Sequence, residues 1–363
     1  MKKTILLFCA TFLVVTINSC SKKSTPNPPD PGLGFTKISY NSTASISVAR
    51  SSFASASFNG SIFFAGGSAD NGVTFSKAVD IYDVQQGAWY VTNLSEARYQ
   101  LAGAGASAKI LFAGGYNGSY SKTVDIYDLI RNLWTTTQLS EARSGLAAAT
   151  AGNIIVFAGG KGAGGVSKTV DIYDALANKW TTATLSVART GLVAAAAGTK
   201  ILFAGGVDGS GVIQKTVDIY DIITKTWSTA TMSTERSHFA AAGAGDKIIF
   251  AGGDTNTNGY VNTADVYDIT TNAWTTSQLS AGRDDLAAAG IPNKIVFAGG
   301  YTGTGSSTIA DVYDIKSSAW TTLQINHGRN MLVGASSGNF ILFAGGKDDN
   351  GPSKIVDLFS LSN

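Results

Sequence analysis

The chain has 363 residues, 44% of them hydrophobic and 14% charged, and its 27 Lys and Arg residues nearly balance 25 Asp and Glu residues. The net charge of +2 falls to zero if residues 1–19, which hold two Lys, are removed, so nothing basic is left to neutralise phosphates and we expect no nucleic-acid partner. Two Cys and two His residues support neither a disulfide framework nor a His-rich metal site, and we expect no metal and no cofactor.

The first element in chain order is an apolar segment behind Lys2 and Lys3. The 13-residue run ILLFCATFLVVTI is shorter than the roughly 20 residues that a membrane-spanning helix needs. It ends at INSC, residues 17–20, which resembles a bacterial lipobox. We therefore predict a lipoprotein signal peptide over residues 1–19 and lipidation of Cys20. The alternative is an ordinary secretory signal that leaves Cys20 as a free thiol.

The next segment, residues 20–35, is rich in Ser, Pro and Gly and predicts a flexible linker that packs no core. A lipidated Cys20 and this linker would tether the protein to a membrane of the bacterial cell envelope. Ser21 stands where many lipoproteins retained at the inner membrane carry Asp, so we expect the outer membrane. We also expect a monomer.

From residue 36 onward the sequence consists of seven similar units, in which the second Gly of a Gly pair returns every 45 to 48 residues. Each unit contains an Arg, an Ala- and Gly-rich run, the Gly pair, a polar loop and a VDIYD-like segment, and six units then carry a Trp. The Arg residues are Arg50, Arg98, Arg143, Arg189, Arg236, Arg283 and Arg329, and the Trp residues are Trp89, Trp134, Trp180, Trp227, Trp274 and Trp320.

Each unit predicts four short strands, because its runs of β-branched, aromatic or small apolar residues are too short for ordinary helices. One such meander cannot cover both of its faces, whereas a closed ring of units covers them all. The pattern resembles the kelch repeat in all seven units. The resemblance implies an all-β, seven-bladed propeller of four-stranded blades over residues 36–363. Kelch-like propellers include protein-binding modules and carbohydrate-active enzymes, so it implies no single function.

The seventh unit ends at VDLFSLSN and lacks the Trp segment. Residues 36–46, TKISYNSTASI, align with the WTTTQL segment of the other units, with Asn41 at the Trp position and Tyr40 available to fill in. We therefore predict that this N-terminal strand closes the ring.

The units differ in length only between the Gly pair and the VDIYD Asp, a separation of 10 to 13 residues, whereas the Arg lies 17 residues before the second Gly in all seven. In a four-stranded meander this loop emerges beside the link that carries the Arg, and insertions on one face mark the likely binding face. We call the face that carries these loops the variable face. The opposite face is predicted to be closed by short hairpin turns. We interpret the recurring Arg, Trp, Asp and Gly residues as scaffold, with Arg binding loop carbonyls and the Gly pairs permitting close blade packing.

Candidate ligand-binding residues are those that differ between blades on the variable face, where aromatic and polar side chains together suit a sugar or a peptide. A solvated surface without a ligand is the alternative. The candidates are Tyr99, Gln100, Tyr116, Tyr120, His238, Asp254, Tyr260, Asp284, Asp285, Tyr301 and Asn330.

One grouping among these candidates is suited to acid/base chemistry, namely His238 with Asp284 or Asp285. Neither a nucleophile nor a metal set accompanies it, and the blades hold no Cys for the Tyr–Cys cofactor of copper-radical oxidases with this kind of propeller. We predict a membrane-anchored binding module for a glycan or a protein rather than an enzyme. The alternative is a carbohydrate-active enzyme, such as a kelch-like sugar epimerase or mutarotase.

Overall fold

A computed structural model describes residues 37–362 except residues 71, 256 and 258. The signal peptide, Cys20 and the linker predicted for residues 1–35 lie outside the described residues. Within the described ranges all regular structure is β-strand, and no helix there is long and apolar enough to cross a membrane.

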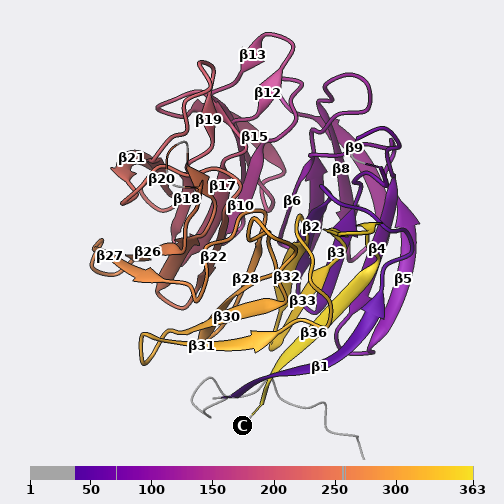
Figure 1. The fold of residues 1–363 in the computed structure, drawn as a ribbon. Coiled ribbons are helices and arrows are strands. Elements are labelled where there is room, and N and C mark those ends of the chain that lie inside the picture. The colour runs from indigo at the N-terminus through magenta and orange to yellow at the C-terminus, as the bar shows by residue number, and fades with distance from the viewer. Residues whose placement is uncertain (1–36, 71, 256, 258, 363) are drawn as a thin grey trace, which may run out of the picture.

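Seven antiparallel sheets of four strands surround a common axis (Figure 1), as predicted. The innermost strands of neighbouring sheets contact one another all the way around, so the ring is closed. The first three blades are β2 (Ala54–Phe58), β3 (Ser61–Ala65), β4 (Ala78–Asp83) and β5 (Ala88–Asn93); β6 (Ala102–Ala106), β7 (Lys109–Ala113), β8 (Thr123–Asp128) and β9 (Leu133–Gln138); and β10 (Ala147–Ala151), β11 (Ile154–Ala158), β14 (Thr169–Asp174) and β15 (Lys179–Thr184).

The next three blades repeat this order from the axis to the rim. They are β17 (Val193–Ala197), β18 (Lys200–Ala204), β20 (Thr216–Asp221) and β21 (Thr226–Thr231); β22 (Ala240–Ala244), β23 (Lys247–Ala251), β26 (Thr263–Asp268) and β27 (Trp274–Gln278); and β28 (Ala287–Ile291), β29 (Lys294–Ala298), β30 (Ile309–Asp314) and β31 (Ala319–Gln324). Short ribbons in the loops are β12 (Lys161–Gly162), β13 (Gly165–Val166), β16 (Arg189–Thr190), β19 (Val207–Asp208), β24 (Asp254–Thr255), β25 (Gly259–Tyr260), β34 (Lys347–Asp348) and β35 (Gly351–Pro352).

The seventh blade joins the two ends of the described chain. Its strands are β32 (Val333–Ser337), β33 (Phe340–Ala344), β36 (Ile355–Ser362) and, at the rim, β1 (Lys37–Ser45). The N-terminal strand therefore closes the ring, which confirms the prediction. In Figure 1 the indigo β1 lies beside the yellow β36.

The residue found at the Trp position of this seam differs from the one predicted for it. Tyr40 pairs with Phe359 as Trp89 pairs with Tyr82 in blade 1, and the Tyr40 and Phe359 rings meet edge to face at 5.5 Å. The register shifts between Tyr40 and Ser42, so Asn41 is the extra residue of a β-bulge. Tyr40, and not Asn41, thus replaces the missing Trp.

The hydrophobic core lies between the blades. Seven clusters of buried side chains each combine one face of a blade with the facing side of the next. In the six Trp-containing blades the Trp is half-buried, with its ring centroid 4.7 to 5.0 Å from that of the Tyr of VDIYD or ADVYD, in a close ring contact that is tilted in five of the blades. The Trp set is therefore part of the scaffold.

Each recurring Arg is completely buried and joined to the first Asp of the VDIYD-like segment of its own blade. In blade 4, Arg189 Nη2 lies 2.5 Å from Asp218 Oδ2 and also donates to the Phe203 carbonyl at 3.0 Å. The second oxygen of Asp218 accepts the backbone N–H of Ser186, in the link from the preceding blade, at 2.8 Å. The carbonyl contacts confirm the predicted role of the Arg, but the ion pair was not anticipated.

The Gly pairs allow one blade to approach the next. In the first pair, Gly66 and Gly67 have φ values of +71° and +102°, and a Cβ on Gly66 would lie 2.6 Å from the Arg98 carbonyl oxygen and 2.7 Å from a Leu101 methyl carbon. Only Gly satisfies both the backbone conformation and the contact. This confirms the role in blade packing that the sequence predicted.

Candidate functional site

The variable face is built from the same backbone contact in every blade. The residue after the Arg forms a β-bridge with the residue after the Gly pair, as between Tyr99 and Tyr116 in blade 2. The equivalent pairs are Ser51 with Ser68, Ser144 with Lys161, Thr190 with Val207, Ser237 with Asp254, Asp284 with Tyr301 and Asn330 with Lys347. The link and the variable loop therefore share one face, and each blade presents two side chains of its own there.

The next residues of the seven links together form a circle around the axis, and we call this circle the mouth. All seven residues have φ between +48° and +63°, the left-handed region. Backbone hydrogen bonds run between blades along the circle, for example from Gln100 N–H to the Ser52 carbonyl at 2.9 Å and from Asp285 N–H to the His238 carbonyl at 2.7 Å. The mouth residues are Ser52, Gln100, Gly145, Gly191, His238, Asp285 and Met331.

A cavity of about 490 Å³ lies within the mouth, above a floor of large apolar side chains. These floor residues directly follow the mouth residues, and each is at most 7% exposed. In the sequence each of them stands at the start of an Ala- and Gly-rich run, so they were not among the predicted candidates. They are Phe53, Leu101, Leu146, Leu192, Phe239, Leu286 and Leu332.

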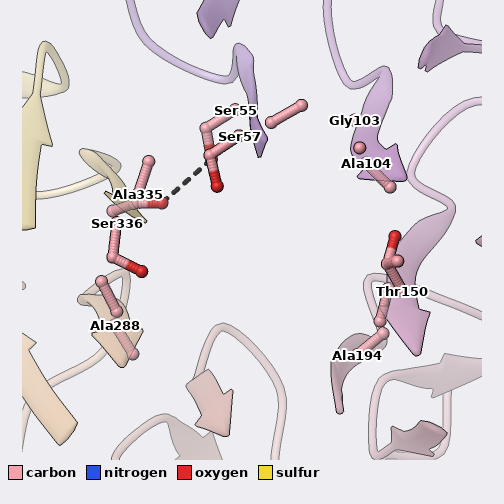
Figure 2. Close-up of a pocket in the computed structure, with 14 residues that line it drawn as sticks. Ser55, Ser57, Gly103, Ala104, Thr150, Ala194, Ala288, Ala335 and Ser336 are labelled. Carbon is pink, nitrogen blue, oxygen red and sulfur yellow. Dashed lines mark hydrogen bonds between the residues drawn. The ribbon is translucent and has the colours of Figure 1, made fainter. Parts of the chain in front are cut away.

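Farther along the axis the inner strands enclose a second cavity of about 270 Å³ (Figure 2). Its wall consists of small residues of the Ala- and Gly-rich runs, and its hydroxyl groups come from Ser55, Ser57, Thr150 and Ser336. Ser55 donates to the Gly334 carbonyl of blade 7 at 2.9 Å. Among the described residues no ionisable side chain lines this cavity, in contrast to the mouth, where His238 and Asp285 lie.

Four half-buried rings from blades 1 and 2 form the first cluster on the variable face, the aromatic group: Phe75, Tyr99, Tyr116 and Tyr120. Phe75 stacks on Tyr99 with ring centroids 5.4 Å apart. Tyr116 meets Tyr99 edge to face at 6.1 Å and Tyr120 at 5.4 Å. Three predicted candidates are thus brought together, and they offer apolar ring surface beside phenol hydroxyls.

The second cluster, the acid–imidazole group, comes from blades 5 and 6 and consists of His238, Asp254, Asp284 and Asp285. His238 Nδ1 lies 3.1 Å from Asp254 Oδ1, which also accepts the Ser237 hydroxyl at 2.7 Å. One buried carboxylate oxygen of Asp284 has no hydrogen-bond partner among the described residues.

Two further candidates, Tyr260 and Tyr301, lie beside the acid–imidazole group. Their rings meet edge to face at 5.8 Å, and Tyr301 shares a β-bridge with Asp284. Tyr260 is 37% exposed, so part of its ring is available to a ligand.

The acid–imidazole group holds protons near neutral pH. Burial opposes a charged imidazole, but the nearby carboxylates, that of Asp285 first, outweigh it and raise the pKa of His238. Burial, together with the negative charge of Asp285, raises the pKa of Asp284 to about 6. Burial also raises the pKa of Asp285. Proton donors and acceptors for the same pH range therefore stand side by side.

Gln100 and Asn330 belong to neither cluster. Gln100 is exposed at the mouth, and its side-chain oxygen lies 3.5 Å from the Ser144 hydroxyl. Asn330 donates to the Ser306 hydroxyl at 2.9 Å.

Among the described residues no three His, Cys, Asp or Glu side chains are arranged to hold a metal ion.

Comparisons with known proteins agree with this architecture. The family model of the KLHDC2/KLHL20/DRC7 Kelch-repeats domain matches residues 104–282, a segment from the second to the fifth blade. A solved structure titled "Structure of YjhT" is similar to this chain with a TM-score of 0.62 and 17% identity, over 77% of this chain and 99% of that one, which shows the fold alone. The search of the curated proteins gave no match. The chain is thus an all-β, seven-bladed propeller with four-stranded blades, and its residues 104–282 match a Kelch-repeat domain.

Proposed function

We propose that the protein is a binding module of the bacterial cell envelope that holds a glycan or protein ligand at the mouth of the variable face. One observation carries the proposal. On this face the backbone is the same in every blade, whereas the side chains differ and gather into the aromatic group and the acid–imidazole group beside a cavity of about 490 Å³. That volume is within the roughly 300 to 1,000 Å³ of typical ligand pockets.

The chemistry of the mouth suits a ligand with both apolar and hydrogen-bonding surface. The floor and the aromatic group bury apolar area, while Gln100, His238 and Asp285 at the rim can donate or accept hydrogen bonds. A sugar ring or an exposed peptide segment has this mixture of groups.

A glycan array and an affinity capture with envelope extract would identify the ligand. Tyr99→Ala should then weaken binding by about 2 kcal/mol, because aromatic residues dominate many binding sites. Asp285→Asn should also weaken it without changing the fold, since Asn tolerates the left-handed backbone of this position. Trp180→Ala, in the scaffold of blade 3, should lower the melting temperature and leave affinity unchanged. Loss of binding only in Trp180→Ala would contradict the proposal.

A second candidate is a sugar epimerase or mutarotase, favoured by the proximity of His238 to the carboxylic acid of Asp284, whose pKa is about 6. Mutarotation needs a general acid and a general base and no covalent intermediate. Saturation-transfer NMR of glucose and galactose measures anomer exchange directly. Exchange that is accelerated by the protein and lost in His238→Asn would establish the enzyme, whereas binding without exchange would establish the module.

The proposed location depends on Cys20. Lipidation there, followed by the linker of residues 20–35, would place a monomeric propeller at the outer membrane. The support for it is the apolar run and the INSC segment of the sequence.

A further inference from the structure

The outer edge between blades 1 and 2 differs from every other junction of the ring. The Tyr of VDIYD, or the Phe that replaces it in blade 7, is at most 7% exposed in six blades. The Tyr127 ring of blade 2 is only half-buried. One of seven equivalent aromatic rings is therefore more exposed than the other six.

At two other junctions this ring is covered by the side chain that begins the second strand of the preceding blade. Lys109 of blade 2 covers Tyr173 of blade 3, with Nζ 2.9 Å from the phenol oxygen, and Lys200 of blade 4 lies 6.0 Å from the Tyr267 ring centroid of blade 5. In blade 1 this position is Ser61, which is too short to reach Tyr127. The other blades have Ile154, Lys247, Lys294 and Phe340 there.

A cavity of about 450 Å³ occupies the space that a longer side chain would fill. Blade 1 contributes Phe63, Tyr90 and Thr92, and blade 2 contributes Tyr127, Asn132 and Trp134. The rim strand of blade 1 is unusual as well, because Tyr90 follows the Trp where every other Trp-bearing blade has Thr or Ser.

The hydrogen bonding of this cavity is incomplete. The indole nitrogen of Trp134 is buried and has no partner among the described residues, whereas that of Trp320 in blade 6 donates to the Ser277 hydroxyl at 2.6 Å. A buried N–H without an acceptor is costly, and a ligand oxygen that reaches it after a small shift of the cavity wall would supply the acceptor. Tyr90 donates its hydroxyl to Gln86 at 2.8 Å, so its phenol oxygen remains able to accept.

We infer that this junction cavity is a binding site for a neutral sugar ring of the pyranose type. It lies at the rim, away from the mouth, and the inference does not rest on the function proposed for the mouth. The apolar face of a pyranose packs against aromatic rings, and its oxygens can accept from Trp134 while its hydroxyls donate to the phenol and carboxylate oxygens.

Charge and polarity argue against two other ligand classes, namely anions and wholly apolar molecules. Asp83 is the one Asp, Glu, Lys, Arg or His residue among the side chains that line the cavity, and its Oδ1 already accepts two backbone N–H groups at 2.8 and 3.0 Å. An anion would find no cationic partner there. A wholly apolar molecule would leave the Trp134 N–H unpaired, with the cost of an unmade hydrogen bond.

Two-dimensional NMR of the ¹⁵N-Trp-labelled protein tests the inference, with the Trp134 indole signal assigned through Trp134→Phe. The probes are methyl glycosides of glucose, galactose, mannose and N-acetylglucosamine. At least one should shift the Trp134 signal. Ser61→Lys, which installs the residue of four other blades, should abolish the shift, and Tyr90→Thr should weaken binding about tenfold, as expected for an aromatic contact.

Two matched variants serve as controls. Lys200→Ser makes the opposite change at the junction of blades 4 and 5, and Tyr99→Ala alters the aromatic group of the variable face, so both should keep the Trp134 response. Ser61→Lys should melt no lower than the unaltered protein, because it covers Tyr127. If none of the glycosides shifts the Trp134 signal, or if the response persists in Ser61→Lys, the inference is wrong.

Discussion

Each of the seven buried Arg residues can be accommodated in its blade only because it is paired with a buried Asp. An unpaired buried charge is strongly unfavourable, and even a paired one gains little over apolar residues of the same size. Arg189 is 0% exposed and Asp218 3% exposed, so neither is solvated by bulk water. The pair therefore fixes the position of the link between blades, while the hydrophobic clusters provide the main stabilisation.

Removing one member of this pair should be severe. Arg189→Met leaves the Asp218 carboxylate buried without its cation, and we expect a loss of about 3 to 5 kcal/mol in the free energy of unfolding, measured by urea titration. Arg131→Ala is the matched control, because that Arg is 75% exposed beside Asp128 and its loss should cost less than about 1 kcal/mol. Equal effects of the two substitutions would contradict the interpretation.

Asp284 should make stability depend on pH in a defined direction. Its pKa of about 6 is above the ordinary 3.8, so the folded protein binds this proton more tightly than the unfolded chain. The resulting stabilisation is complete below pH 4 and is lost as the pH rises through 6. The melting temperature of the unaltered protein should therefore fall relative to that of Asp284→Asn between pH 4 and pH 7. Parallel melting profiles of the two proteins would show that Asp284 is not perturbed.

At the scale of elements, the constant spacing of the repeat made the blades predictable. Every unit has the same distance from Arg to Gly pair, and each strand of the sheet lies where that spacing places it. The bulge at Asn41 was not predictable. The closing strand differs in sequence from the Trp segments of the other units, so a comparison with them does not reveal its extra residue.

The candidate site was predictable in part. The variable loops and the links share one face, as the sequence indicated, but which side chains meet there depends on the packing of neighbouring blades. His238 lies in one blade and Asp285 in the next, and the pKa values of both are raised by surroundings that a sequence does not display: neighbouring carboxylates for His238 and burial for Asp285. The cavity beside Ser61 depends in the same way on which strand faces Tyr127.

The closing strand should be essential to the fold. Deleting residues 37–45 removes β1 and exposes the edge of β36, and an exposed edge strand promotes aggregation. We expect a lower melting temperature and soluble aggregates, measured by differential scanning fluorimetry and size-exclusion chromatography. A variant that begins at Lys37 is the control, since it keeps β1. If the two truncated proteins melt at the same temperature, β1 does not close the ring in solution.

At the scale of the whole molecule, the proposed anchor and the propeller should be separable. Cys20→Ala should abolish labelling by radioactive palmitate and release the protein from the membrane fraction, while the melting temperature of the propeller stays the same. Cys20→Ser serves as a second thiol-free variant and should behave identically. Labelling that persists in either variant would rule out lipidation at Cys20.

The pairing of β1 with β36 also sets an order of events during folding. Lys37 pairs with Ser362, so β1, the first strand of the propeller to be made, has its partner in β36, the last strand of the propeller. Contacts between such distant parts of a chain form slowly, because a long loop must close before they give any stabilisation. Six blades can assemble while the chain is still being made, but the seventh cannot. Until β36 has been made, β1 is an unpaired strand, and an interrupted chain that lacks β36 never gains a closed ring.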